Sequence, residues 1–147
     1  MAHVRKSIRD NIETTLTGLT TTGSNVYVTR FYPLAEAKVS GLSIYTNSEA
    51  TETSTLKTPR TQLRTLEVMV EAYVKGTTGI DDTLDTIAVE VEEALTTDIT
   101  RGGNAKDTKV TAFEASYAGD GDQPVGVGRF TLEVLYATLE NDIETAV

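Results

Sequence analysis

The chain has 147 residues and carries 13 basic and 22 acidic residues, a formal net charge of −9, and this length is enough for one domain with a real hydrophobic core. The absence of cysteine excludes disulfides, thiol nucleophiles and thiolate metal sites. Because binding to a phosphate backbone needs clustered lysines and arginines, this charge balance argues against sequence-specific recognition of DNA or RNA. No apolar run approaches the ~20 residues that cross a bilayer, so we expect no membrane contact.

Threonine is unusually frequent, at 26 of the 147 residues. Its β-branched side chain favours strands and extended loops over helix interiors. The composition therefore points away from a helical bundle.

The first element is an amphipathic helix, predicted over residues 3–17 and ended by Gly18. Its apolar stripe recurs every four residues: Val4, Ile8, Ile12 and Leu16. Three cations stand in its first turns, where the helix dipole disfavours positive charge: Arg5, Lys6 and Arg9. They indicate either an exposed terminus or contact with an acidic partner. Two strands are then predicted, over residues 25–31 and 41–47.

Residues 48–75 join a long polar segment to the most regular strand pattern in the chain. In the strand predicted over residues 61–75, large apolar side chains alternate with Glu67, Met69, Glu71 and Tyr73, which share the other face. Residues 48–62 instead form a long polar arm in which Leu56 is the only large apolar residue before the strand begins and Pro59 interrupts pairing. A structureless segment of this length is usually functional or disordered, so we expect a mobile arm that contacts a partner.

The second half of the chain predicts a helix that begins near Asp81 or Asp82, followed by strands over residues 109–118 and 125–139. The helix has one apolar stripe and one acidic face, which a solvated surface explains. Gly126 and Gly128 indicate a bulge or a close backbone contact in the last strand. Residues 140–147 are acidic and are expected to fray.

Strands in consecutive runs, not alternating with helices, indicate an α+β fold. We predict a single domain over residues 1–147 in the order α-β-β-β-α-β-β, with a mostly antiparallel five-stranded sheet and two helices packed on one face.

Candidate catalytic residues are scarce. His3 is the only histidine and lies beside a terminus. A Ser-His-acid triad or a histidine metal site would have to use this residue, so we do not expect either. Asp120 and Asp122 lie in a glycine-rich turn that joins two strands and has no lysine, unlike a phosphate loop. Glu67 and Glu71 would lie ~13 Å apart on one strand, too far for a catalytic pair. We expect no enzyme activity, no cofactor and no metal.

The order of elements and several segments resemble the tail terminator proteins of long-tailed bacteriophages, the lambda-type minor tail protein U family. The resemblance rests on patterns of elements and turns and covers nearly the whole chain. The segments that carry it are VRKSIRDNIETTL, NVYVTRFYPL, VSGLSIYTNSE, LRTLEVMVEAYVKG, DDTLDTIAVEVEEAL and SYAGDGDQPVGVGRFTLEVLYAT.

This resemblance implies a virion structural protein of the tail or neck, made in the bacterial host cytoplasm. Such a protein forms a hexameric ring on the tail tube, stops tube polymerisation and presents a surface to the head connector or neck protein. Double-stranded DNA passes through its lumen without sequence-specific binding. The alternatives are a head-completion or tail-tube protein, or a small ligand- or metal-binding module at the Asp120–Asp122 turn.

Identical acidic subunits must avoid like-charge contact, so we expect the scarce cations to pair across subunit interfaces. The alternating Glu67–Tyr73 face is expected to supply apolar contacts to a neighbouring subunit. The residues predicted at the assembly interface are Glu49, Thr55, Leu56, Lys57, Arg60, Arg64, Arg30 and Arg101.

Overall fold

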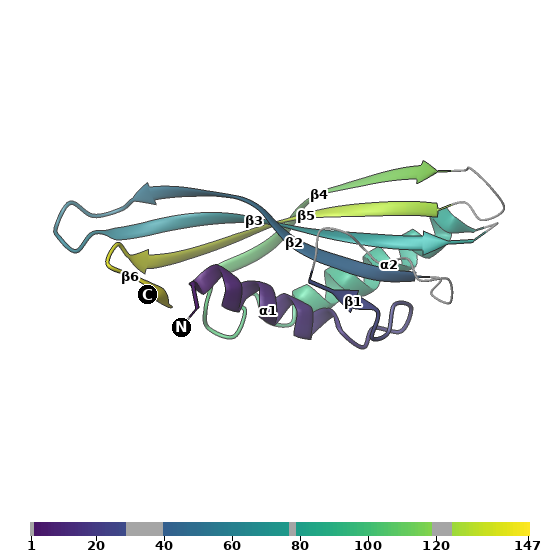
Figure 1. Cartoon of the computed structure of the whole chain (residues 1–147), viewed down its shortest axis with the longest axis horizontal. Coiled ribbons are helices and arrows are strands. Elements are labelled where there is room, and N and C mark those ends of the chain that lie inside the picture. Colours follow the sequence, from purple (N-terminus) through teal and green to yellow (C-terminus); the bar gives the residue numbers. More distant parts are fainter. Residues whose placement is uncertain (1, 29–39, 77–78, 119–124) are drawn as a thin grey trace.

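The computed structural model describes residues 2–28, 40–76, 79–118 and 125–147, which form two helices and six strands. In chain order these are α1 (Val4–Leu16), β1 (Val26–Tyr27), β2 (Ser40–Thr53), β3 (Thr61–Lys75), α2 (Ile80–Leu95), β4 (Asp107–Ala118), β5 (Val125–Leu139) and β6 (Asp142–Ala146). Both helices lie on the same side of an elongated, twisted sheet (Figure 1). No helix of the described residues is long and apolar enough to cross a membrane.

The sheet has the strand order β1-β2-β3-β5-β4, and β6 pairs with the end of β5. All pairs are antiparallel except β1 with β2, which is parallel. The predicted α+β class, with two helices and a mostly antiparallel sheet, is confirmed. The sheet has six strands instead of five because residues 142–146, expected to fray, return along β5, where Ala146 lies opposite Thr138.

The hydrophobic core lies between the helices and the inner face of the sheet. The predicted stripe of α1 is fully buried, and the apolar face of β3 alternates as expected, with Leu66, Val68 and Val70 all completely inaccessible to solvent. The helix α2 contributes Leu84, Ile87, Val91 and Leu95. Each helix buries one apolar stripe, and both stripes join the same cluster of buried apolar side chains on the inner face of the sheet.

The glycines of β5 permit close contacts with side chains of α2 and β4, which is one of the two alternatives, a bulge or a close contact, that the sequence left open. A Cβ atom on Gly126 would lie 2.2 Å from Cγ2 of Ile80, and one on Gly128 would lie 2.8 Å from the ring of Phe113. Both distances are below van der Waals contact, so a larger residue at either position would push the helix or the edge strand away from the sheet.

The prediction of an irregular arm over residues 48–62 is wrong. Strand β2 continues past residue 47 to Thr53 and pairs with β3, from Ser48 opposite Glu67 to Thr53 opposite Gln62, after an irregularity in register beyond Thr46. A long two-stranded ladder satisfies the backbone groups of a polar segment without needing a core of its own, and its threonines favour the extended conformation. Only residues 54–60 remain as a turn, and the hairpin projects beyond both helices (Figure 1).

Three other boundaries differ from the predictions. The helix α2 begins at Ile80, behind Gly79 with a φ of 71°, and no side chain caps it. Strand β4 begins at Asp107. A shift in register between Val110 and Ala112 means that Thr111 no longer shares a face with Phe113 as a regular strand would require. Within the described residues the strand expected over 25–31 comprises only the two residues of β1, and positions 29–39 lie outside the description.

Candidate assembly surface

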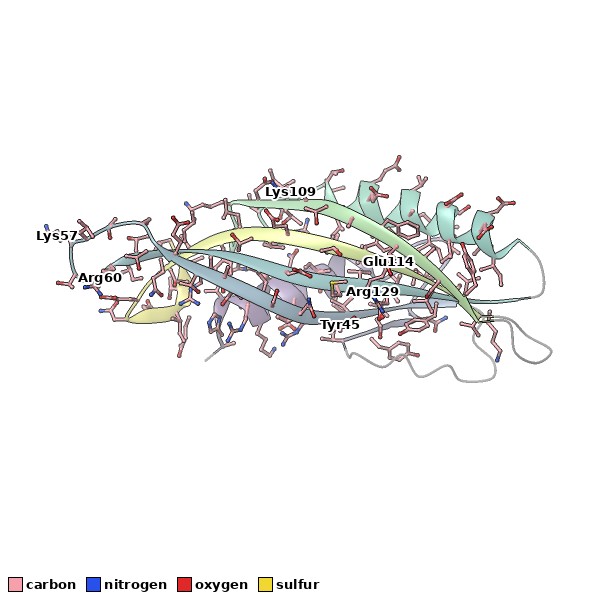
Figure 2. The ribbon with its side chains drawn as sticks, turned by 90° about the horizontal axis from the view of Figure 1, so that it is seen from above. Tyr45, Lys57, Arg60, Lys109, Glu114 and Arg129 are labelled. Atoms are coloured by element: carbon pink, nitrogen blue, oxygen red, sulfur yellow. The ribbon has the colours of Figure 1, made fainter. Side chains whose placement is uncertain are left out.

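The structural feature that stands apart from the core is the hairpin of residues 48–62, called the hairpin arm below; residues 54–60 are its tip. The tip is closed by its own polar groups: the amide of Ser54 donates to the carbonyl of Thr61 at 2.8 Å, and the amide of Thr61 donates to Oγ1 of Thr55 at 2.9 Å. Leu56 is 94% exposed, and Lys57 is also exposed. Lys57 and Arg60 mark the far end of the molecule in Figure 2.

One side of the tip is tied to the body. Nη1 of Arg60 lies 3.5 Å from Oε2 of Glu140, and the amide of Glu140 donates to the carbonyl of Arg60 at 2.8 Å. About half of the Arg60 side chain stays exposed, so this surface ion pair contributes little to stability. Thr55, Leu56, Lys57 and Arg60, predicted at the assembly interface, are thus brought together at one exposed end of the chain.

The base of the hairpin arm is held by a buried carboxylate. Glu49 lies on the inner face of β2, and its side chain is only 8% exposed. Its Oε2 accepts from Nη1 of Arg5 at 2.7 Å and from Nη1 of Arg64 at 3.1 Å, while its Oε1 accepts from the hydroxyl of Tyr136. Arg64 also donates from Nη2 to Oε1 of Gln62 at 2.7 Å. Glu49 therefore joins α1, β3 and β5 at the point where the hairpin leaves the core.

The electrostatics of this cluster follow from burial and from its charges. Burial, followed by the hydrogen bond to Glu49, raises the pKa of Tyr136 well above its ordinary value. Burial and the nearby Arg5 lower the pKa of His3, whose neutral Nδ1 accepts from the amide of Arg5 at 3.2 Å and caps α1. Of the predicted interface residues, Glu49 and Arg64 are consequently used inside the subunit.

The outer face of the sheet is covered by its own polar side chains. Glu71 is 5% exposed; its Oε2 accepts from the hydroxyl of Tyr45 at 3.3 Å, and its Oε1 lies 3.2 Å from Nη2 of Arg129. Burial and Glu71 raise the pKa of Tyr73 to about 12. Tyr45, Arg129 and Glu114 lie along this face in Figure 2. Met69 is only 6% exposed and Tyr73 is half-buried, so little apolar surface of the predicted Glu67–Tyr73 face remains open to a neighbouring subunit.

Arg101 occupies the interior and not a surface. Its side chain is fully buried, and Nη2 donates to the carbonyls of Leu95, at 2.7 Å, and Asp98. The last carbonyls of a helix lack intrahelical donors and attract positive charge, which explains why this guanidinium folds back onto the end of α2. Burial lowers the pKa of Arg101, only partly offset by Asp98. The prediction that Arg101 pairs across a subunit interface is therefore corrected: it closes its own helix.

The helical cations are also used within the chain. Arg9 donates to Oγ1 of Thr46 at 3.0 Å, and Lys6 pairs with Asp10 at 2.7 Å. Arg30, another predicted interface residue, lies outside the described residues.

The sequence candidates for small-molecule chemistry are the Asp120–Asp122 turn and the carboxylates of Glu67 and Glu71. The Asp120–Asp122 turn lies outside the described residues. In the part of the chain that the structure describes, no group of three or more His, Asp or Glu side chains is arranged to hold a metal ion. The carboxylate of Glu67 accepts a hydrogen bond from Nδ2 of Asn47 at 2.9 Å. The carboxylate of Glu71 accepts from Tyr45 and Arg129, so these hydrogen bonds do not link the two carboxylates to each other.

Comparison with known proteins assigns no family. No protein-family model matches the chain, and no curated protein matches its sequence. Among solved structures, the chain is similar to a chain described as "Virion of native gene transfer agent (GTA) particle", with 15% identity and a TM-score of 0.44 over 90% of this chain and 92% of that chain. An identity and a TM-score this low do not assign a function.

Proposed function

We propose that this protein is a structural component of a phage-like virion: a ring-forming tail terminator that caps the tail tube, stops its polymerisation and provides the surface to which the head joins. The observation that carries the proposal is the hairpin arm. It is held firmly at its base by Glu49, yet its tip presents a leucine that is 94% exposed and buries nothing in its own subunit. We take this apolar side chain, held out on a projecting hairpin, as the point where the chain assembles with others.

The proposal also draws on the sequence resemblance to lambda-type terminators, which implies six subunits, a tail-tube partner and a head-connector or neck partner. A net charge of −9 per subunit suits a lumen through which DNA passes, because a basic lumen would retain it by many phosphate contacts. The function is mechanical, and we propose no catalytic residue and no cofactor.

A head-completion or tail-tube protein is the alternative within the same class. A tail-tube protein and a terminator differ in how assembly ends: a tube protein adds further rings to itself, whereas a terminator forms one ring and blocks addition. A closed ring reuses one heterologous interface around its axis and leaves no free copy of that interface.

Native mass spectrometry of the purified protein, together with electron microscopy of tail tubes assembled in its presence, tests the proposal. We expect a hexamer at high protein concentration, and tubes that stop growing once the protein is added. Stacked rings that grow from this protein alone would identify a tube protein instead. A monomer that leaves tube growth unchanged would reject the proposal.

A further inference from the structure

The tip of the hairpin arm combines one exposed apolar side chain with two cations. Leu56 is 94% exposed and is followed closely by Lys57 and Arg60, both also exposed. The sequence contains no acidic residue from position 53 to position 66. A surface that complements this tip would therefore present an exposed apolar side chain surrounded by carboxylates.

The outer face of α2 has this composition. Val89 is 55% exposed, although the opposite side of the same helix is buried in the core. Asp85 lies one turn before Val89, and Glu92 and Glu93 lie one turn after it, so all four side chains share a face. From residue 76 to residue 100 the sequence has no lysine, arginine or histidine. Within the described part of the chain, none of the three carboxylates forms a salt bridge.

The two surfaces of one subunit cannot meet. The tip of the hairpin arm lies at one end of the long axis, whereas α2 runs from the other end and stops short of the arm (Figure 1). The carboxylate that fixes the base of the arm also prevents it from folding back along the helices. The surface that fits the tip is therefore available only on another copy of the chain.

We propose that the tip of the hairpin arm docks on the outer face of α2 in a neighbouring copy, with Leu56 against Val89 and with Lys57 and Arg60 against the carboxylates around it. A contact between two different surfaces of identical subunits is heterologous and closes into a ring when its rotation allows. It also sets scarce cations against acidic groups, which offsets part of the repulsion between subunits that each carry −9. This inference deepens the proposed function, since it names the interface that builds the proposed ring.

Cross-linking is a direct test, because the native chain has no cysteine. The double variant Leu56→Cys/Val89→Cys, treated with a short bis-maleimide at a concentration where rings form, should give a ladder of covalent oligomers up to the full ring. A mixture of the two single variants should stop at dimers, since each subunit then carries one thiol. The matched control is Leu56→Cys/Glu114→Cys, with the second thiol on the exposed outer face of β4. An equal ladder from the control, or no ladder from the Val89 variant, would overturn the proposal.

Charge reversal separates this inference from the proposed function. The variant Lys57→Glu/Arg60→Glu should weaken ring association by at least about tenfold. Adding Asp85→Lys/Glu92→Lys to the same chain should restore it. The control Lys106→Glu/Lys109→Glu makes the same change of charge at two exposed positions outside the hairpin arm and α2. If wild-type rings form and the tip reversal leaves them unchanged, the docking surface is wrong and the ring proposal stands. If the wild type forms no ring, both fail.

Discussion

At the scale of single residues, the carboxylate of Glu49 holds two arginines and one tyrosine hydroxyl. It accepts from Arg5, Arg64 and Tyr136, which belong to three different elements. The Arg64 side chain is only 11% exposed, so loss of its negative partner would leave a guanidinium in a poorly hydrated position. The burial of this one side chain explains why the hairpin arm leaves the body in a defined direction.

We expect Glu49→Gln to lower the free energy of unfolding by about 2–3 kcal/mol, because the amide keeps the shape but cannot neutralise two guanidinium groups. Urea denaturation followed by circular dichroism measures this loss. The matched control is Glu52→Gln, an exposed position three residues along the same strand, which should change stability by no more than about 0.5 kcal/mol. Equal losses in the two variants would mean that the cluster does not hold the arm.

His3 gives the fold a pH dependence below neutrality. Its pKa is lowered from 6.5 in the folded chain, chiefly by burial, so the unfolded chain binds the proton more readily. Its contribution to stability is therefore complete above the unfolded pKa of 6.5 and is lost as the pH falls through the lower, folded value. As the only histidine, it gives an unambiguous imidazole signal in NMR.

We expect the NMR titration of His3 to have its midpoint below 6.5. The variant His3→Asn keeps a good capping residue but does not titrate. Between about pH 7 and pH 5 the wild type should lose stability relative to this variant, as measured by thermal melting. A midpoint at or above 6.5, or parallel stability curves, would show that the cap does not depend on neutral His3.

At the scale of elements, the hairpin arm separates into a structural base and an exposed tip. The base contains Glu49 and the paired residues up to Thr53, and its loss would damage the core. The tip contributes one surface ion pair and the carbonyl of Arg60 to the rest of the chain. A variant that replaces residues 49–59 as a unit would therefore mix a folding defect with an assembly defect.

A cleaner variant replaces residues 55–60 with Asn-Gly, a two-residue turn that suits the Ser54–Thr61 pair. We expect its melting temperature to stay within a few degrees of the wild type, because only weak surface contacts are removed. Ring formation, measured by native mass spectrometry, should be lost. Wild-type rings from a well-folded tip variant would show that the arm is not the assembly element.

At the scale of the whole molecule, an exposed tip with basic residues offers a cleavage site that assembly should cover. In the free subunit, trypsin should cut after Lys57, since the tip is exposed and lies outside the strand ladder. In the ring, this cut should be slowed while cleavage after the exposed Lys106 continues at its original rate. Mass spectrometry of the fragments follows both sites, and equal rates at Lys57 before and after assembly would place the tip outside the interface.

The sequence alone was sufficient for the elements whose apolar groups recur at a regular interval. The stripe of α1 and the alternating face of β3 bury a continuous apolar surface whichever neighbours are present, so local periodicity predicted them correctly. The glycines of β5 indicated a bulge or a close contact, and side chains of Ile80 and Phe113 lie close to them. The exposed residues of the hairpin tip were found by their polarity and by the isolation of Leu56.

Only the tertiary structure decided the paths of β2 and β6 and the roles of the buried charges. A polar, threonine-rich segment has no apolar period to mark it as a strand, and it becomes one because β3 supplies backbone partners along its whole length. Glu49 looks like any acid of a polar arm, but Arg64, Arg5 and Tyr136, which lie 15, 44 and 87 residues away along the chain, converge on it. Hydrogen bonds over such separations depend on the folded arrangement of strands and helices, and the pattern of neighbouring residues does not encode them.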